Sequence, residues 1–226
     1  MTTIIGIQGD HYAVIGVDSR VSEAPDQGVT TQILTLTESN SKVALNGRYL
    51  IGAAGDLRAI NILHHAFKPP ECPPNLKGKK LDHFFTVKFI PALMECFDLH
   101  KYSQPQNETS LHLSEQGSSI IVSVNNTLYV IDGDYSWASD LSAIYAIGSG
   151  AEYALGAAYT IIGKSNPSLG AARKIAMKAL AAAGKFDPGT GPPYHIYSQG
   201  KGLEKPQKFT SRKLAKTSKT SAKKDF

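Results

Sequence analysis

The stretch TTIIGIQGDHYAVIGVDSR, residues 2–20, decides the fold. It contains two apolar, β-branched runs, residues 3–8 and 12–17, which are separated by the turn-favouring pair Gly9 and Asp10. The pattern predicts a β-hairpin whose first strand begins immediately at the N-terminus.

Apolar runs bounded by turn residues continue along the chain. They predict hairpins at 43–45 with 49–54 and at 120–124 with 128–131, and single strands at 33–36, 143–147 and 194–198. Helical periodicity predicts a helix from the N-cap Asp56 to Phe67, a helix over 84–97 kinked at Pro91, and helices over 151–162 and 168–183. Polar or proline-rich composition predicts loops at 22–31, 68–80 and 103–116.

Strands and helices occur in separate groups rather than in alternation. This order argues against βαβ units and favours stacked layers. We therefore expect an α+β fold, a four-layer α/β/β/α sandwich in which two antiparallel sheets lie between helix layers.

The composition is that of a globular protein, with 42% apolar and 19% charged residues. No apolar run approaches the roughly 18 residues of a spanning helix, and the N-terminus lacks the pattern of a secretory signal. The two cysteines, Cys72 and Cys96, suit a reducing compartment. The seven histidines show no metal-ligand spacing, which argues against a metal site. Taken together, these features predict a cytoplasmic protein with no membrane insertion, no metal and no cofactor.

The net charge of +5 is unevenly distributed along the chain. From Lys201 onward there are nine basic and two acidic residues, so the first 200 residues carry a net charge of −2. This Ser/Thr/Lys-rich segment has too few apolar residues to offset the entropy of ordering. We expect one domain over 1–200 and a flexible basic tail over 201–226. Because only Phe209 and Phe226 are aromatic, a solvated tail is favoured over a nucleic-acid contact.

Thr2 is a candidate nucleophile, because a small residue at this position permits removal of the initiator methionine. The exposed α-amine would have a pKa of about 7.7 to 8.0, so a fraction of it is neutral at physiological pH and can accept the hydroxyl proton. Nucleophile and base would then lie on one residue. A threonine at position 2 is common in inert proteins, so the candidate depends on its surroundings.

Several short motifs surround this candidate in the sequence. They are TTIIGI at 2–7, GVDSR at 16–20, Lys42 with Val43, AAG at 53–55, IGSG at 147–150 and DPGTG at 187–191. Together, over about residues 2–198, they resemble proteasome β subunits, which are threonine peptidases of the N-terminal-nucleophile hydrolase class. The likeness is to the simple bacterial forms, in which methionine removal is the sole maturation step.

The resemblance implies a role for each matched residue. The Lys42 ammonium would stabilise the alkoxide and keep the α-amine neutral, and Asp18 would hold Lys42 in place. The backbone N–H of Gly55 would meet the developing oxyanion. Two further roles are implied. Ser149, Asp187 and Thr190 would orient the amine and an attacking water, and Thr190 stands where the family has serine. A specificity pocket would be lined by Val21, Ala53 and Leu57. The small Ala53 would leave room for a large apolar substrate side chain.

The resemblance further implies hydrolysis of polypeptides through an acyl-enzyme on Thr2 within a homo-oligomeric ring, with an unfolding ATPase as a candidate partner. The long 20–42 segment, the proline-rich 68–80 insertion and the basic tail depart from the family pattern.

Other readings of the same residues stay open. Asp18 with Arg20 could form a surface ion pair, Lys42 could be a solvated strand-edge lysine, and the glycines around Ser149 could cradle a phosphate. The whole chain could be an amidase of the same fold acting on a small amide, or a catalytically idle shell subunit with a nucleic-acid-binding tail.

Overall fold

The computed structural model describes residues 1–23, 32–105, 114–163, 165–200 and 207–210. Its main strands form two five-stranded antiparallel sheets. The first has the order β12-β1-β2-β13-β14, with bounds Ile144–Ile147, Ile4–Gly9, Tyr12–Val17, His195–Gly200 and Gln207–Thr210. The second has the order β11-β10-β9-β6-β5, with bounds Trp137–Ala138, Thr127–Ile131, Ser119–Val124, Tyr49–Ala54 and Val43–Asn46.

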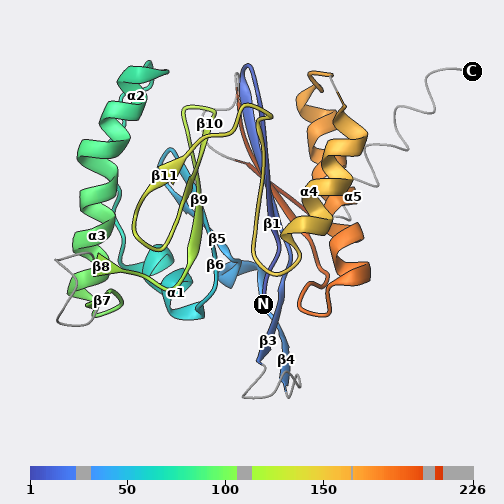
Figure 1. The fold of residues 1–226 in the computed structure, drawn as a ribbon, viewed down its shortest axis with the longest axis horizontal. Coiled ribbons are helices and arrows are strands. Elements are labelled where there is room, and N and C mark those ends of the chain that lie inside the picture. The colour runs from blue at the N-terminus through green and yellow to red at the C-terminus, as the bar shows by residue number, and fades with distance from the viewer. Residues whose placement is uncertain (24–31, 106–113, 164, 201–206, 211–226) are drawn as a thin grey trace, which may run out of the picture.

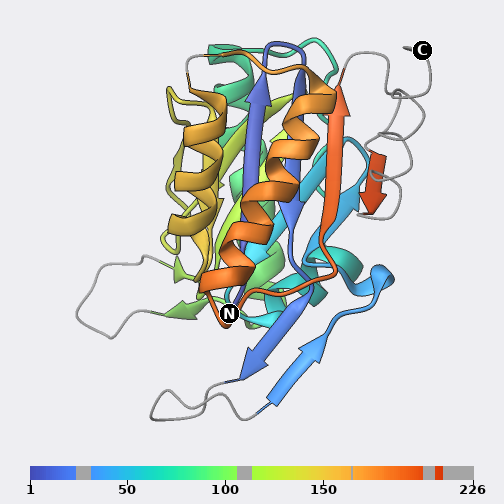
Figure 2. The ribbon, with the colours of Figure 1, turned by 90° about the vertical axis from the view of Figure 1, so that its right-hand side faces the viewer.

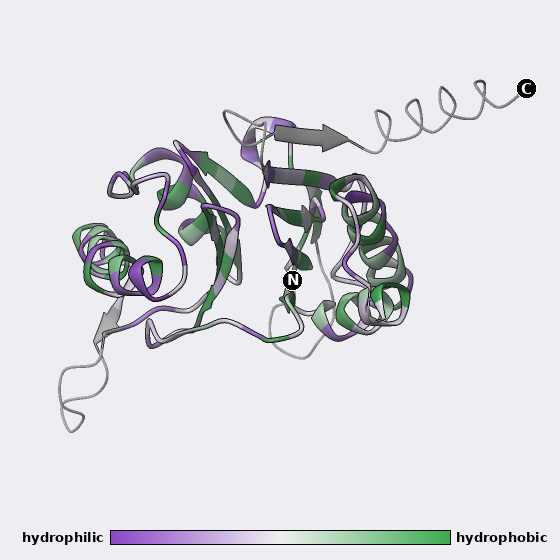
Figure 3. Cartoon of the chain, turned by 90° about the horizontal axis from the view of Figure 1, so that it is seen from above, coloured by the Kyte–Doolittle hydropathy of each residue, from purple (hydrophilic) through white to green (hydrophobic). Residues whose placement is uncertain are grey.

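Helices cover the outer face of each sheet (Figure 1). The second sheet is covered by α1 (Leu57–His65), α2 (Lys79–Phe84), the π-helical segment η2 (Phe85–Phe89) and α3 (Ile90–Leu99). The first sheet is covered by α4 (Ala151–Ile162) and α5 (Leu169–Phe186). Seen from above, the two sheets lie between these two helix layers (Figure 3).

Three apolar clusters lie between the four layers. One joins the second sheet to α1, η2 and α3, another joins the first sheet to α4 and α5, and the third lies between the two sheets. Strand β1 contributes to two of these clusters, because Ile5 and Ile7 face the helices whereas Ile4 faces the other sheet. Burial on both faces explains its nearly continuous apolar run. The predicted four-layer α/β/β/α sandwich is confirmed.

The predicted N-terminal hairpin is present, with its turn at residues 10 and 11 rather than at Gly9 and Asp10. Ile4 pairs with Val17 and Gly9 with Tyr12, which places residue 2 and residue 18 at the same end of the hairpin. The predicted cap of α1 is also present, since the Asp56 carboxylate accepts from the N–H of Arg58 at 2.8 Å. The hairpin thus fixes the place of the N-terminus at one end of the sandwich.

Several details differ from the sequence predictions. At the place of the kink predicted at Pro91, the structure has the π-helical segment η2, which ends two residues before the proline. Pro91 has no N–H to donate, so the regular helical hydrogen bonding is disturbed there. The expected loop over 22–31 begins inside β3 (Arg20–Glu23), which pairs with β4 (Gln32–Thr35), and residues 24–31 lie outside the described residues.

The predicted loop over 103–116 also contains regular structure. Its described ends form the short strands β7 (Gln104–Pro105) and β8 (Ser114–Glu115), while residues 106–113 lie outside the described residues. A short 3-10 helix, η1 (Glu38–Asn40), precedes β5.

The described part of the segment predicted as a basic tail, residues 207–210, forms the strand β14, which extends the first sheet by pairing with β13. The remainder of 201–226 lies outside the described residues, so a flexible tail beyond a single domain stays a prediction. None of the helices in the described part of the chain combines the length and apolarity that a membrane span requires.

The hairpin of β3 and β4 projects from the body of the sandwich, near the N-terminus (Figure 2). Its base adjoins the end of β2, because the Leu36 N–H donates to the Ser19 carbonyl at 2.8 Å. The hairpin therefore starts at the same end of the sandwich as residue 2.

Candidate active site

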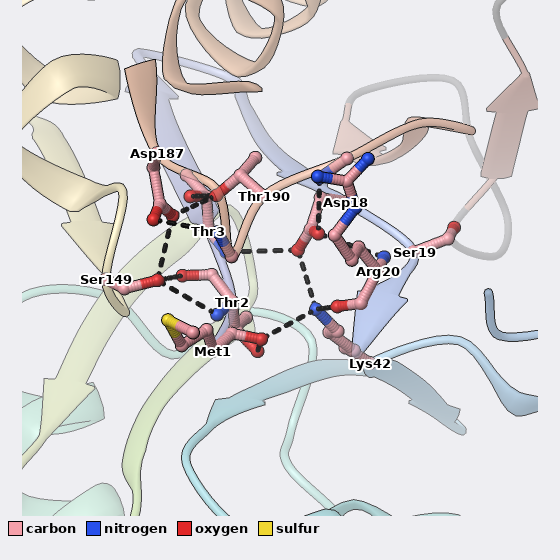
Figure 4. Close-up of polar contacts among 12 residues, drawn as sticks. Met1, Thr2, Thr3, Asp18, Ser19, Arg20, Lys42, Ser149, Asp187 and Thr190 are labelled. Carbon is pink, nitrogen blue, oxygen red and sulfur yellow. Dashed lines mark hydrogen bonds and ion pairs between the residues drawn. The ribbon is translucent and has the colours of Figure 1, made fainter. Parts of the chain in front are cut away.

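Thr2 lies two residues before the first residue of β1 and is 3% exposed. Its main-chain nitrogen donates to Ser149 Oγ at 3.3 Å, and its Oγ1 donates to the Met1 carbonyl oxygen at 2.7 Å (Figure 4). The nitrogen and the hydroxyl of one residue therefore face different partners.

On the hydroxyl side lies an ion pair between Lys42 and Asp18. Lys42 Nζ contacts Asp18 Oδ1 at 2.7 Å, and both side chains are fully buried. Lys42 Nζ also donates to the Arg20 carbonyl and, at 3.4 Å, to the Met1 carbonyl oxygen. The readings of Asp18 as part of a surface ion pair and of Lys42 as a solvated lysine are wrong, because both groups are inside the protein.

Three backbone N–H groups also hold the Asp18 carboxylate. Thr3 donates to Oδ1, and Arg20 and Gly191 donate to Oδ2, each at 3.0 Å. These donors come from the residue before β1, the start of β3 and the loop before β13. The carboxylate is thus anchored by three segments that the fold brings to one end of the sandwich.

Burial changes the proton affinity of both amines near Thr2. Burial lowers the pKa of the Lys42 ammonium, and the neighbouring Asp18 carboxylate opposes this change. Burial, and then the positive charge of Lys42, lower the pKa of the Met1 α-amine, against the attraction of Asp18 and Asp187. The site therefore favours neutral amines more than water does.

On the nitrogen side lies a second carboxylate, Asp187, at the C-terminal end of α5. Its Oδ2 accepts from Ser149 Oγ at 2.8 Å and from Thr190 Oγ1 at 2.5 Å, and its Oδ1 accepts from the Gly189 N–H at 3.0 Å. The Asp187 N–H itself donates to the Ala183 carbonyl at 2.7 Å, which ties the carboxylate to the last turn of the helix. A chain of hydrogen bonds thus runs from Thr2 N through Ser149 to Asp187.

Gly55 lies at the turn that follows β6 and has a φ of +135°, a value that favours glycine. A Cβ at this position would lie 2.7 Å from the Gly117 carbonyl oxygen. Across the site, Gly148 has a φ of +94°, and a Cβ there would lie 2.1 Å from the Thr2 carbonyl oxygen and 3.3 Å from Ala54 Cβ. The turn that carries Gly55 is therefore next to the strand end that carries Thr2.

The three residues predicted to line a specificity pocket come from different elements. Val21 is a buried residue of β3, Ala53 is a fully buried residue of β6, and Leu57 is the half-buried first residue of α1. Ala53 and Leu57 belong to the same apolar cluster beneath α1. A substrate pocket formed by all three stays a prediction.

Sequence reasoning missed three residues that shape the site. Thr3 and Arg20 lie inside the quoted motifs, yet their contacts with Asp18 use backbone groups, which a motif does not reveal. Gly150 is also within a quoted motif, and a Cβ there would lie 2.2 Å from Thr3 Oγ1. The φ of Gly150, −94°, does not itself require glycine, so the close approach is visible only in the folded structure.

No group of three or more potential metal ligands among His, Cys, Asp and Glu occurs in the part of the chain described by the structure. The polar atoms around Thr2 are instead hydroxyls, carboxylates, one ammonium and backbone groups. This set is suited to proton transfer and to stabilisation of a developing negative charge.

The four layers, together with an N-terminal strand that begins beside two buried carboxylates, define the fold of the N-terminal-nucleophile hydrolases. Solved structures share this fold. The protein described as Thiobacillus denitrificans BPH superposes with a TM-score of 0.67 at 19% identity, over 88% of this chain and 97% of that one. Its complex with epoxomicin gives the same TM-score and identity, over 89% of this chain and 100% of that one.

A more distant likeness is to the eukaryotic HslV from Trypanosoma brucei, with a TM-score of 0.54 at 21% identity, over 88% of this chain and 99% of that one. No model of a known family and no curated protein matches the sequence. The resemblance to proteasome β subunits is thus confirmed at the level of the fold, which is a proteasome-like peptidase fold.

Proposed function

We propose that this protein is a threonine-type endopeptidase whose nucleophile is Thr2 after removal of Met1. One observation carries the proposal. Thr2 Oγ1 and Lys42 Nζ both contact a single atom, the Met1 carbonyl oxygen, while Thr2 N contacts Ser149 on the other side. Loss of Met1 would remove this shared oxygen and leave an amine, a hydroxyl and an amino group around one vacated position.

The free α-amine of Thr2 would act as the general base. The pKa of the Met1 amine is already lowered by burial and by Lys42, and Thr2 is more deeply buried than Met1. The same influences would keep a large fraction of the Thr2 amine neutral near pH 7, ready to accept the Oγ1 proton. Lys42, held by Asp18, would stabilise the oxygen as its proton leaves.

Attack of Thr2 Oγ1 on a peptide carbonyl carbon would form a C–O bond and place negative charge on the carbonyl oxygen. The N–H of Gly55, on the adjacent turn, is the proposed donor to this oxyanion, and one such donor contributes roughly 3 to 4 kcal/mol. Collapse of the intermediate would break the C–N bond, with the proton on the Thr2 amine passing to the leaving amine. Water, deprotonated by the same amine and oriented by Ser149 and Asp187, would then hydrolyse the ester.

The fold also supports a proposal for the substrate and for the assembly. A proteasome-like peptidase fold supports polypeptide substrates and a homo-oligomeric ring, and we propose both for this chain. The proposed pocket of Val21, Ala53 and Leu57 would favour a large apolar side chain before the cleaved bond. An unfolding ATPase as partner and a cytoplasmic location belong to the same proposal.

The test compares two forms of the protein after intact-mass measurement has defined the N-terminus. Protein that begins at Thr2 should hydrolyse peptides from a fluorogenic panel, and Thr2→Ala should lose at least 100-fold in kcat/KM. Thr160→Ala, which removes an exposed hydroxyl on α4, is the matched control and should leave activity unchanged.

Two further measurements separate the rival functions. Epoxomicin, which the similar Thiobacillus denitrificans protein binds, should inhibit hydrolysis here as well. Small amides included in the panel test the amidase reading, because cleavage of small amides without peptides would contradict the endopeptidase. Hydrolysis that survives in Thr2→Ala would contradict the nucleophile.

A further inference from the structure

Thr3 has a fully buried side chain that lies inside the candidate active site and takes no part in the proposed catalytic steps. Its Oγ1 forms a hydrogen bond with Thr190 Oγ1, and its N–H donates to Asp18 Oδ1 at 3.0 Å. Thr190 in turn donates to Asp187 Oδ2 at 2.5 Å. Thr3 therefore contacts Asp18 through its backbone N–H and is linked to Asp187 through its side chain and Thr190 (Figure 4).

Proton counting fixes the direction of these bonds. A carboxylate only accepts hydrogen bonds, and a threonine hydroxyl has a single proton to donate. Since Thr190 gives its proton to Asp187, the proton between the two threonines belongs to Thr3. The hydroxyl of Thr3 thus donates to Thr190, which donates to Asp187.

The same oxygen of Asp187 receives a second hydroxyl chain. Ser149 donates to Oδ2 at 2.8 Å and accepts from Thr2 N at 3.3 Å. The two chains, from Thr3 and from Thr2, therefore meet at one carboxylate oxygen. The position of that oxygen sets the position of the Ser149 hydroxyl beside the Thr2 nitrogen.

Gly150 provides independent evidence that the Thr3 hydroxyl belongs in this place. A Cβ on Gly150 would lie 2.2 Å from Thr3 Oγ1, 2.8 Å from Thr190 Oγ1 and 2.9 Å from Asp187 Oδ2. Its φ of −94° is open to any residue, so the backbone conformation does not require glycine. The space that a side chain would need is occupied by these three oxygen atoms.

We propose that Thr3 is a positioning residue of the active site, whose hydroxyl fixes the Thr190–Asp187 pair and thereby the Ser149 hydroxyl that contacts the Thr2 nitrogen. This inference rests on the proposed function of Thr2. Without the Thr3 hydroxyl, a lone pair of the buried Thr190 oxygen loses its donor, and the donation from Thr190 to Asp187 weakens because linked hydrogen bonds polarise one another.

The test uses Thr3→Val, which keeps the shape of the side chain and removes the hydroxyl. We expect kcat to fall by about tenfold with KM unchanged, because the amine is misplaced while the substrate site is intact. Thr3→Ser restores the hydroxyl and should return kcat to within about twofold of the original protein. Thr3→Cys, a weak donor of similar size, should stay closer to Thr3→Val.

Two controls separate positioning from stability. Ser123→Ala removes a fully buried hydroxyl that donates to Gln199 Oε1 at 3.0 Å, away from this site, and should lower the melting temperature without lowering kcat. In a Thr190→Val background, Thr3→Val should have no further effect on kcat, because the hydrogen bond it removes is already lost.

The possible results are distinct. A Thr3→Val protein that melts earlier yet keeps the original kcat would overturn the inference and leave the Thr2 mechanism standing. If Thr3→Val does not fold, equal kcat values for Thr3→Ser and Thr3→Cys would overturn it. If the original protein shows no hydrolysis that depends on Thr2, both proposals fail.

Discussion

Replacement of Lys42 by methionine is the most informative single change, because it separates the stability of the site from its chemistry. Lys42 Nζ is 2.7 Å from Asp18 Oδ1, and neither side chain is exposed. Breaking a buried ion pair by removing one partner typically costs about 3 to 5 kcal/mol. Asp18 keeps three backbone N–H donors, so we expect the low end of this range, about 3 kcal/mol.

The assay is denaturant unfolding of Lys42→Met beside peptide hydrolysis by the folded fraction. Hydrolysis should fall by at least about 100-fold, because the charge next to Thr2 Oγ1 is lost. The double variant Lys42→Met, Asp18→Asn removes the uncompensated charge and should recover part of the stability. Recovery is incomplete because the asparagine amide can accept backbone N–H bonds at only one of the two positions that the carboxylate oxygens occupy. It should not recover activity. A single variant that loses less than about 1 kcal/mol, or a double variant that regains hydrolysis, would refute this reasoning.

Further predictions concern pH and two glycines. The kcat/KM for peptides should rise with pH as the Thr2 amine loses its proton. The midpoint of this rise should lie below the ordinary α-amine pKa of about 7.7 to 8.0, because burial and Lys42 lower the pKa of an amine in this place. A midpoint above about 8 would contradict the role of the amine as general base. Gly55→Ala should lower the unfolding free energy by about 1 to 3 kcal/mol and should also lower kcat, because Gly55 has a φ of +135° and a Cβ there would lie 2.7 Å from the Gly117 carbonyl oxygen. Equal stability and kcat in the Gly55→Ala variant and the original protein would argue against a strained donor turn. Gly156→Ala on α4 should instead stabilise the protein by up to about 1 kcal/mol, because nothing lies within 4 Å of the new Cβ and alanine favours the helix. Thermal unfolding would measure this gain, and the peptide assay should show an unchanged kcat.

Much of the fold follows from local sequence signals. The runs that form β1 and β2 are separated by two turn residues, and Asp56 caps α1 through its own side chain. These features depend on residues that are near one another in the chain, which is why alternation, turn residues and caps predict them.

Two of the strands that were missed, β3 and β14, lack such signals. The strand β3 begins at Arg20 and has a polar sequence, and β14 lies in a segment whose positive charge indicates solvation. Both form because a partner strand offers its free edge, β4 in one case and β13 in the other. A partner of this kind is a tertiary feature that no short window contains.

The candidate site shows the same division. Short motifs singled out Asp18, Lys42 and Ser149, and the structure brings them around Thr2 although Ser149 is far away in the sequence. The contribution of Thr3 could not be predicted, because its hydroxyl acts on Thr190 across the folded structure. The fit of Gly150 against that hydroxyl is likewise visible only when β1 and α4 are packed together.

The central claim, that the free amine and the hydroxyl of Thr2 are the catalytic pair, can be tested in one measurement. Protein preparations with a known ratio of Met1-bearing to Thr2-initiated chains, determined by intact mass, are assayed for peptide hydrolysis. We predict that activity is proportional to the Thr2-initiated fraction and extrapolates to zero when every chain keeps Met1. Full activity in chains that keep Met1, whose Thr2 nitrogen is a peptide nitrogen and cannot serve as a base, would contradict the account.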